Sequence, residues 1–249
     1  KRQPDSMAKA KYAAMRERSV GLGVMGFHSY LQANMIPWES VMAKVWNNRI
    51  FSHIKEQVDH ASRLLAEERG ACPDAAECGM QERFSNKTAI APTASISIIC
   101  GGASPGIEPI AGNSFTHKTL SGSFNVRNRH LAKLLDEKGR NDDDTWSSIV
   151  TSGGSVMHLD FLTDEEKAVF KTAFEIDQRW LVEFAGDRAP LIDQAQSLNV
   201  FLPANIHKRD LHQIHYQAWK RGVKSLYYCR SLSIQRAERS DSETPTDQD

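Results

Sequence analysis

Two short apolar segments separated by one amphipathic segment near the end of the chain limit the folds that it can adopt. Residues 197–201 and 224–229 are rich in residues that favour strands, and residues 208–221 are typical of a helix that ends at Gly222. A strand–helix–strand order places the two strands parallel, joined by a right-handed crossover. The sequence therefore predicts an α/β fold with a parallel sheet.

Other elements of such a fold are expected upstream. Residues 88–91 predict a short buried strand, and residues 40–69 predict a long amphipathic helix that Gly70 ends. Residues 114–126 predict a hairpin around Ser121-Gly122. Helical patterns are further found over residues 16–32 with irregular spacing, 128–137 capped by Asn128, 163–174 opened by a capping box of Thr163 and Glu166, and 175–184.

Length and charge restrict the class of protein. With 249 residues the chain can bury a substantial core, in one large domain or two small ones. Its 31 basic and 31 acidic residues give a net charge of zero, so no overall field attracts nucleic acid or an anionic membrane. No apolar run approaches the roughly 20 residues that span a bilayer. We therefore expect a cytoplasmic protein with no nucleic-acid and no membrane partner.

The cysteines and histidines do not form a metal-binding pattern. Cys72 and Cys78 do not match Cys-x-x-Cys, and His212 and His215 do not match His-Glu-x-x-His. A solvated helix face explains these histidines, and His207 beside them, equally well. We therefore expect no metal site, and reduced thiols at all four cysteines: Cys72, Cys78, Cys100 and Cys229.

The run Gly21-Leu-Gly-Val-Met-Gly26 matches the glycine spacing of a dinucleotide-binding loop. Such a loop needs a preceding strand and an acidic residue on a second strand about 20 residues later, and neither is found here. Tight packing between a strand and a helix, permitted by the glycines, is the better interpretation. A nucleotide-cofactor dehydrogenase remains a distant alternative.

A polar turn follows the predicted strand at 88–91. Its residues are Pro92, Thr93, Ala94, Ser95, Ile96 and Ser97. Three hydroxyl groups and several free backbone N–H groups at a helix start are suited to binding an anion, although hydroxyl-rich turns also serve as ordinary helix caps. Residues 106–109, Gly-Ile-Glu-Pro, follow at a distance that would let a second loop close over the same site.

Tyr227 and Tyr228 are adjacent in an otherwise apolar predicted strand. Two aromatic residues with strand propensity, one pointing into the core and one outward, explain this pair without any function. A functional interpretation is that two phenols in contact relay an electron and a proton together.

Five segments, taken together, resemble one protein family in order and spacing: residues 18–26, 92–97, 106–109, 197–199 and 222–228. The family is the large, catalytic subunit of class I ribonucleotide reductase, and the resemblance extends over residues 16–236. It implies part of a ten-stranded α/β barrel, in which two five-stranded parallel halves surround a finger loop. Residues 1–236 would form the second half with its surrounding helices, and residues 237–249, which have no apolar content, a disordered tail.

The resemblance also implies the roles of the site residues. The loop from Pro92 to Ser97 would bind the diphosphate of a ribonucleoside diphosphate, with Ile96 in a position that is often serine in the family. Tyr227 and Tyr228 would pass a radical from the small, metal-containing subunit to an active-site cysteine, whose thiyl form removes the 3′ hydrogen of the ribose. Because the pair is needed only where a separate subunit generates the radical, it favours class I. The resemblance further predicts that Tyr227 and Tyr228 are in contact and face the interior, with the Pro92–Ser97 loop opening on the same cavity.

Several parts of the family pattern are not found in these 249 residues. They are the Asn-x-Cys-x-Glu finger-loop segment, the reducing cysteine pair, the effector domain and the terminal cysteine pair that accepts electrons from thioredoxin or glutaredoxin. We therefore expect a fragment that binds no cofactor itself and is inactive alone. It would act with the amino-terminal part of the large subunit, the small subunit and a second large subunit. The alternative is a catalytically idle scaffold or assembly module.

Overall fold

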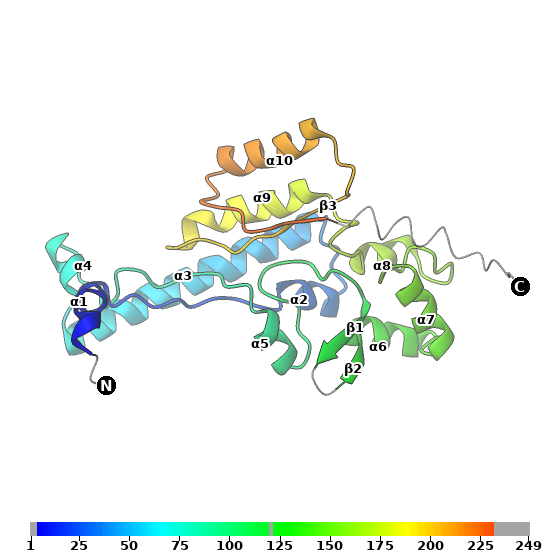
Figure 1. The fold of residues 1–249 in the computed structure, drawn as a ribbon, viewed down its shortest axis with the longest axis horizontal. Coiled ribbons are helices and arrows are strands. Elements are labelled where there is room, and N and C mark those ends of the chain that lie inside the picture. Colours follow the sequence, from blue (N-terminus) through cyan, green and yellow to red (C-terminus); the bar gives the residue numbers. More distant parts are fainter. Residues whose placement is uncertain (1–3, 120–121, 232–249) are drawn as a thin grey trace, which may run out of the picture.

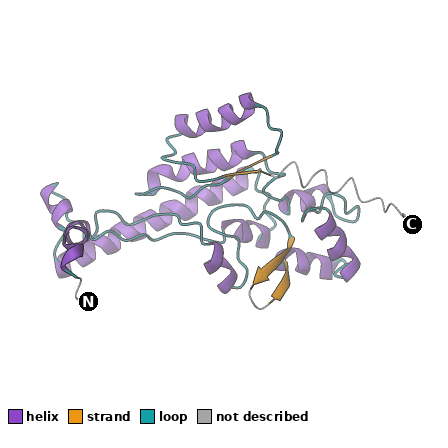
Figure 2. Ribbon diagram, in the orientation of Figure 1, coloured by secondary structure: helices purple, strands orange, loops and turns teal. Residues whose placement is uncertain are grey.

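The computed structural model describes residues 4–119 and 122–231, and the helices dominate it (Figures 1 and 2). The helices are α1 (Ala8–Glu17), α2 (Phe27–Ala33), α3 (Val41–Arg69), α4 (Pro73–Glu77), α5 (Ala94–Ile99), α6 (Arg129–Glu137), α7 (Asp143–Thr151), α8 (Asp164–Val169), α9 (Gln178–Arg188) and α10 (Lys208–Lys220), with short 3-10 turns at Asp5–Met7 and Ala189–Leu191. The strands are β1 (Ser114–Thr119), β2 (Gly122–Arg127), β3 (Val200–Leu202) and β4 (Cys229–Ser231).

Four extended segments run parallel, side by side, in the order of the sequence. Leu22 pairs with Thr88, and Ile90 pairs with Gln196, each as an isolated parallel bridge. β3 then pairs with β4 in parallel, with Val200 opposite Cys229. The predicted α/β arrangement with a parallel pair is thus confirmed. The five-stranded half barrel stays a prediction, because the described residues form only this small parallel sheet and the separate hairpin of β1 (Ser114–Thr119) and β2 (Gly122–Arg127).

The sequence placed both strands of the parallel pair too early. The predicted strands at 197–201 and 224–229 are three residues each in the structure and begin at Val200 and Cys229. Leu198 donates its N–H to Gln196 within the same segment, which interrupts the regular ladder before β3. The predicted strand at 88–91 is likewise reduced to bridges on either side.

The long helix α3 begins and ends where the sequence predicted. Ser40 caps it, with its Oγ accepting the N–H of Ala43 at 3.1 Å, and Gly70 follows its last residue with a φ of +80°. α9 packs against α3 on one side and α10 on the other, so these three helices form successive layers (Figure 1). The helix predicted at 208–221 is confirmed as α10.

Local capping signals also located the shorter elements. Thr163 and Glu166 form the predicted capping box, and Asn128 accepts the N–H of His130 at the start of α6. α8 nevertheless ends at Val169 rather than near 174, because the following Phe170 turns into the core of α6 and α7. The helix predicted at 175–184 begins later, after the cap Asp177, and is α9.

The hairpin predicted over 114–126 is confirmed by the antiparallel pairing of β1 and β2, from Ser114–Arg127 to Thr119–Gly122. Of its turn, Leu120 and Ser121 lie outside the described residues, as does the predicted disordered tail at 237–249. Among the residues that the structure does describe, no helix is long and apolar enough to cross a membrane.

The glycine run at 21–26 belongs to an extended segment rather than to a helical one. The N–H of Val20 bonds to the carbonyl of Asn86, which draws this part of the predicted 16–32 pattern into the parallel sheet. A Cβ on Gly23 would lie 2.7 Å from the carbonyl oxygen of Ala89, and Gly26 has a φ of +82° where α2 begins. Close packing permitted by the glycines is therefore confirmed, but the prediction of a strand packed on a helix is wrong, because the close approach is made between two extended segments.

We predict that Gly23→Ala destabilises the fold by about 1–3 kcal/mol, because backbone must move to admit the methyl group. Gly21→Ala is the matched control, since its Cβ would make only an ordinary 3.5 Å contact with Ala89. Urea unfolding followed by circular dichroism measures both. Equal free energies of unfolding for the two variants would contradict the prediction.

Candidate functional site

The polar turn after the segment 87–91 bends sharply at Thr93, which has a φ of +53°, and enters α5. The Oγ1 of Thr93 accepts the N–H of Gly106 at 2.7 Å. A Cβ on Gly106 would lie 3.2 Å from the carbonyl oxygen of Ala91, so the 106–109 loop packs closely against the main chain that leads into the turn. The 106–109 loop thus lies against the turn, as its spacing in the sequence led us to expect; that the two enclose an anion site stays a prediction.

The first turn of α5 exposes part of the predicted anion site. The first N–H groups of a helix have no acceptor within it, and here these are the groups of Ala94, Ser95 and Ile96. All three residues are exposed. Ser97, in contrast, is buried and donates its Oγ to the carbonyl of Ala94 at 3.1 Å. Of the predicted hydroxyl groups, that of Ser95 is therefore the one left facing outward.

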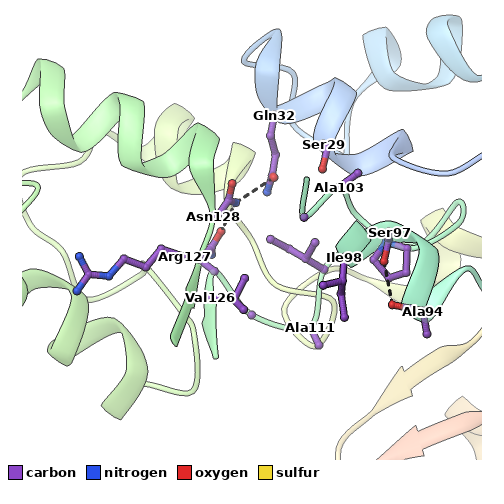
Figure 3. A pocket seen from close by; sticks show the side chains of 15 residues that line it. Ser29, Gln32, Ala94, Ser97, Ile98, Ala103, Ala111, Val126, Arg127 and Asn128 are labelled. Carbon is purple, nitrogen blue, oxygen red and sulfur yellow. Dashed lines mark hydrogen bonds between the residues drawn. The ribbon is translucent and has the colours of Figure 1, made fainter. Parts of the chain in front are cut away.

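A cavity of about 410 Å³ lies beside α5 (Figure 3). Ala94 and Ser97 line it, and across from them three amide side chains form a hydrogen-bonded group. The Nδ2 of Asn128 donates to the Oε1 of Gln32 at 3.0 Å and to the Oδ1 of Asn113 at 2.8 Å. Neutral donors and acceptors, rather than charged groups, make up most of the polar lining.

Tyr227 and Tyr228 are in contact, with ring centroids 4.1 Å apart and ring planes at 53°. The predicted contact is confirmed, but the prediction that both face the interior is wrong for this chain: they are 49% and 55% exposed. They lie just before β4, the outermost of the four parallel segments in the described residues, so only one side of the pair is covered.

The tyrosine pair and the turn line different cavities. Tyr227 and Tyr228 line a cavity of about 480 Å³ together with residues of α10, including His215 and Trp219. The expectation that the turn would open on the same cavity as the pair is therefore wrong. The turn faces the space beside α5, whereas the pair faces α10.

The turn and the tyrosine pair nevertheless lie on either side of the same extended segment, residues 194–202. Two residues beyond the Ile90–Gln196 bridge, one segment reaches Pro92 and its neighbour reaches Leu198, whose carbonyl accepts the N–H of Tyr227 at 2.8 Å. One segment therefore separates Pro92 from the pair, which corresponds to about 10 Å, or two inter-strand spacings.

A bulge in the parallel ladder explains how adjacent tyrosines touch. In regular pairing, one residue between Leu198 and Val200 faces one residue on the neighbouring strand. Here Tyr227 donates its N–H to Leu198, while the carbonyl that accepts from Val200 belongs to Tyr228. Two tyrosines thus stand opposite the single residue Asn199, and the strict alternation of side chains is broken.

Two residues without an assigned role from the sequence connect the 106–109 loop to this bulge. Glu108 is buried, and its two carboxylate oxygens accept the N–H and the Nδ2 of Asn199 at 2.6 and 3.0 Å. Asn199 in turn accepts the N–H of Tyr228 on its Oδ1 at 3.0 Å. Burial raises the pKa of Glu108, although the bonds from Asn199 and the charges of Arg230 and Arg188 oppose this shift.

The pKa of Tyr227 is shifted from its usual value. The hydrogen bond to Tyr228 and the charge of that neighbour raise the pKa of Tyr227 above its usual value. The guanidinium of Arg230, which lies 5.8 Å from the centroid of the Tyr228 ring, acts in the opposite direction.

The four cysteines are free thiols; Cys72 is buried and the other three are exposed. Within residues 4–119 and 122–231, no three histidine, cysteine, aspartate or glutamate side chains are placed to hold a metal ion.

A buried histidine fixes the loop that closes the first cavity. The Nδ1 of His28 on α2 accepts the N–H of Ile110 at 3.0 Å, and the imidazole is fully buried. Burial lowers the pKa of His28 to about 3.

We predict that His28 makes the fold sensitive to acid. An unfolded histidine binds a proton near pH 6.5, whereas folded His28 does so only near pH 3, so stability is lost as the pH falls between these values. His28→Asn keeps an acceptor for Ile110 but does not titrate. Between pH 7 and pH 5 it should lose about 2 kcal/mol less than the unchanged chain. Urea titrations at both pH values measure this, and identical losses would contradict it.

A family model described as the barrel domain of ribonucleotide reductase matches residues 2–80 and 75–229. The ribonucleoside-diphosphate reductase large subunit of Invertebrate iridescent virus 6 is 44% identical over 243 residues, covering 96% of this chain and 25% of that protein. The large subunit of Invertebrate iridescent virus 3 is 42% identical over 246 residues, covering 98% of this chain and 39% of that protein.

A solved structure is similar as well. The class Id ribonucleotide reductase alpha subunit of Actinobacillus ureae superposes with a TM-score of 0.85 at 40% identity, covering 93% of this chain and 42% of that one. The chain thus spans between a quarter and about two fifths of the length of these three proteins.

Proposed function

Because this chain belongs to the ribonucleotide reductase large-subunit family, we propose that it supplies the substrate phosphate loop and the tyrosine relay of a class I ribonucleoside-diphosphate reductase. The observation that carries the proposal is the contact between Tyr227 and Tyr228, 4.1 Å between centroids, in a strand that Asn199 and Glu108 connect to the loop bonded to Thr93. The remaining parts of the ten-stranded barrel would come from the amino-terminal portion of the large subunit.

In this proposal the diphosphate binds at the start of α5. Backbone N–H groups of Ala94, Ser95 and Ile96 lack acceptors within the helix, and such groups bind anions well. The exposed Ser95 adds a hydroxyl donor, whereas Ile96 adds none. Backbone N–H donors therefore contribute most of the diphosphate binding. The hydrogen bond from Gly106 to Thr93 holds the turn that carries them.

The tyrosine pair passes an electron and a proton in one step. A phenoxyl at one ring accepts both from the neighbouring phenol, so that the first ring becomes a phenol and the second a phenoxyl. The contact between the two rings, with centroids 4.1 Å apart, brings the two phenol groups close enough for this transfer. The half-exposed outer side of the pair is where the small subunit, with its metal-dependent radical, would approach.

The other participants follow from the same proposal. A cysteine on the amino-terminal portion would take the hole from the pair and abstract the 3′ hydrogen, and thioredoxin or glutaredoxin would restore the reducing thiols. A second large subunit would complete an alpha dimer.

We predict that this chain, mixed with the amino-terminal portion and a radical-loaded small subunit, reduces a ribonucleoside diphosphate. Tyr228→Phe should abolish turnover, because phenylalanine has no ionisable hydroxyl. Ser95→Ala should raise KM by about ten- to a hundredfold, because a hydrogen bond to a charged phosphate is lost. Deoxynucleotide formation is measured by chromatography.

Tyr12→Phe, at a 66% exposed tyrosine on α1, is the matched control and should leave turnover unchanged. A Tyr228→Phe variant with normal turnover would refute the relay. An unchanged mixture without turnover would instead support the alternative of a scaffold module.

A further inference from the structure

The bulge at Tyr227 and Tyr228 leaves one main-chain group without its usual partner. In regular parallel pairing the N–H of Tyr228 would bond to the carbonyl of Leu198, but Tyr227 occupies that carbonyl. The Oδ1 of Asn199 accepts the Tyr228 N–H instead, at 3.0 Å. A side chain on the neighbouring segment thus replaces a missing ladder bond.

Glu108 determines which way the Asn199 amide points. An ionised carboxylate only accepts hydrogen bonds, so the donor Nδ2 of Asn199 must face Glu108 and the acceptor Oδ1 must face Tyr228. The backbone N–H of Asn199 donates to the other carboxylate oxygen. Asn199 and Glu108 are 3% and 6% exposed, so water does not compete freely for these bonds.

The surroundings keep Glu108 in place. Its loop is attached to the 92–97 turn through the bond from Gly106 to Thr93. The positive charge of the fully buried Arg188 favours the ionised carboxylate, and Arg188 is itself held by Asn47 and Gln196 at 2.8 and 2.6 Å. The Glu108 carboxylate is therefore held in position and orients the Asn199 amide.

We infer that Asn199, oriented by Glu108, is a positioning residue that holds the bulge and thereby keeps the two phenols on one side of the strand. The inference deepens the proposed function and rests on it for its consequence in turnover. Without the Asn199 acceptor, the N–H of Tyr228 has no partner in the bulged register. A shift of the strand by one residue gives it one, because the N–H of Tyr228 then bonds to the carbonyl of Leu198. In that register neighbouring side chains alternate, and the two rings separate.

The test first removes the acceptor that Asn199 provides. It then restores this acceptor with the carboxylate and the amide exchanged between positions 199 and 108. Asn199→Ala abolishes the bond to Tyr228. Asn199→Asp alone places two carboxylates face to face. Asn199→Asp combined with Glu108→Gln restores every donor and acceptor, because the glutamine amide then donates to the aspartate, whose other oxygen accepts from Tyr228.

Gln178→Met is the matched control for a buried amide. Its Oε1 accepts the N–H of Phe201, two residues beyond Asn199 on the same extended segment, at 2.8 Å. The substitution removes this bond and the two bonds that the Nε2 of Gln178 donates to the carbonyls of Ala173 and Ile176, and it leaves the bulge bonds intact.

The readout is nuclear magnetic resonance of the full 249-residue chain with labelled tyrosine, of which it has five. We expect a nuclear Overhauser contact between the Tyr227 and Tyr228 rings, and a raised Tyr227 pKa, in the unchanged chain, the control and the double variant. Asn199→Ala and Asn199→Asp should lose the contact, and their Tyr227 pKa should return toward the usual value. Retention of both signals in folded Asn199→Ala, or no recovery in the folded double variant, overturns the inference.

Turnover separates this inference from the proposed function. In the reconstituted mixture, Asn199→Ala should lower kcat by about 10²-fold at unchanged KM, as expected when reacting groups are displaced by about 1 Å. If the ring contact is lost in this variant while kcat is retained, the relay is refuted and the positioning role stands. If the contact and kcat are both retained, the positioning role is refuted.

Discussion

Main-chain hydrogen bonds between four parallel segments hold the candidate site together. The segment at 87–91 delivers the chain into the turn at Pro92, and the segment at 194–202 carries Asn199 between that turn and the tyrosine pair. Each segment contributes few hydrogen bonds, so a local change in one segment alters the pairing of its neighbours. The approach of Gly23 to Ala89 at one edge and the bulge at Tyr228 at the other are both consequences of this narrow sheet.

The features that the sequence predicted well are those determined within a few residues. Thr163 and Glu166 satisfy each other's backbone across three positions, and Ser40 and Gly70 act on the ends of α3 in the same local manner. The 92–97 turn was identifiable because a strand followed by hydroxyl-bearing residues is a local pattern. The Tyr227–Tyr228 contact was expected from the family resemblance, since strand alternation alone predicts opposite faces.

The features that the sequence did not predict depend on partners far along the chain. Glu108 and Asn199 are 91 positions apart, and no spacing rule indicates that one orients the other. The glycine run read as irregular helix because its pairing partner, Ala89, lies on a distant segment. The exposure of the tyrosine pair likewise depends on which segments cover β4, and no local pattern around Tyr227 and Tyr228 indicates them.

The separation of the pairing partners along the chain bears on how the sheet assembles. Pairing Leu22 with Thr88, or Ile90 with Gln196, closes a long loop of the chain. β3 and β4, in contrast, are joined by the single, shorter crossover through α10. Closing a shorter loop costs less conformational entropy, so the β3–β4 unit is the part of the sheet that forms at the lowest entropic cost. The tyrosine bulge therefore belongs to the most local unit of the sheet, and the Glu108 bond joins it only when the distant 106–109 loop docks.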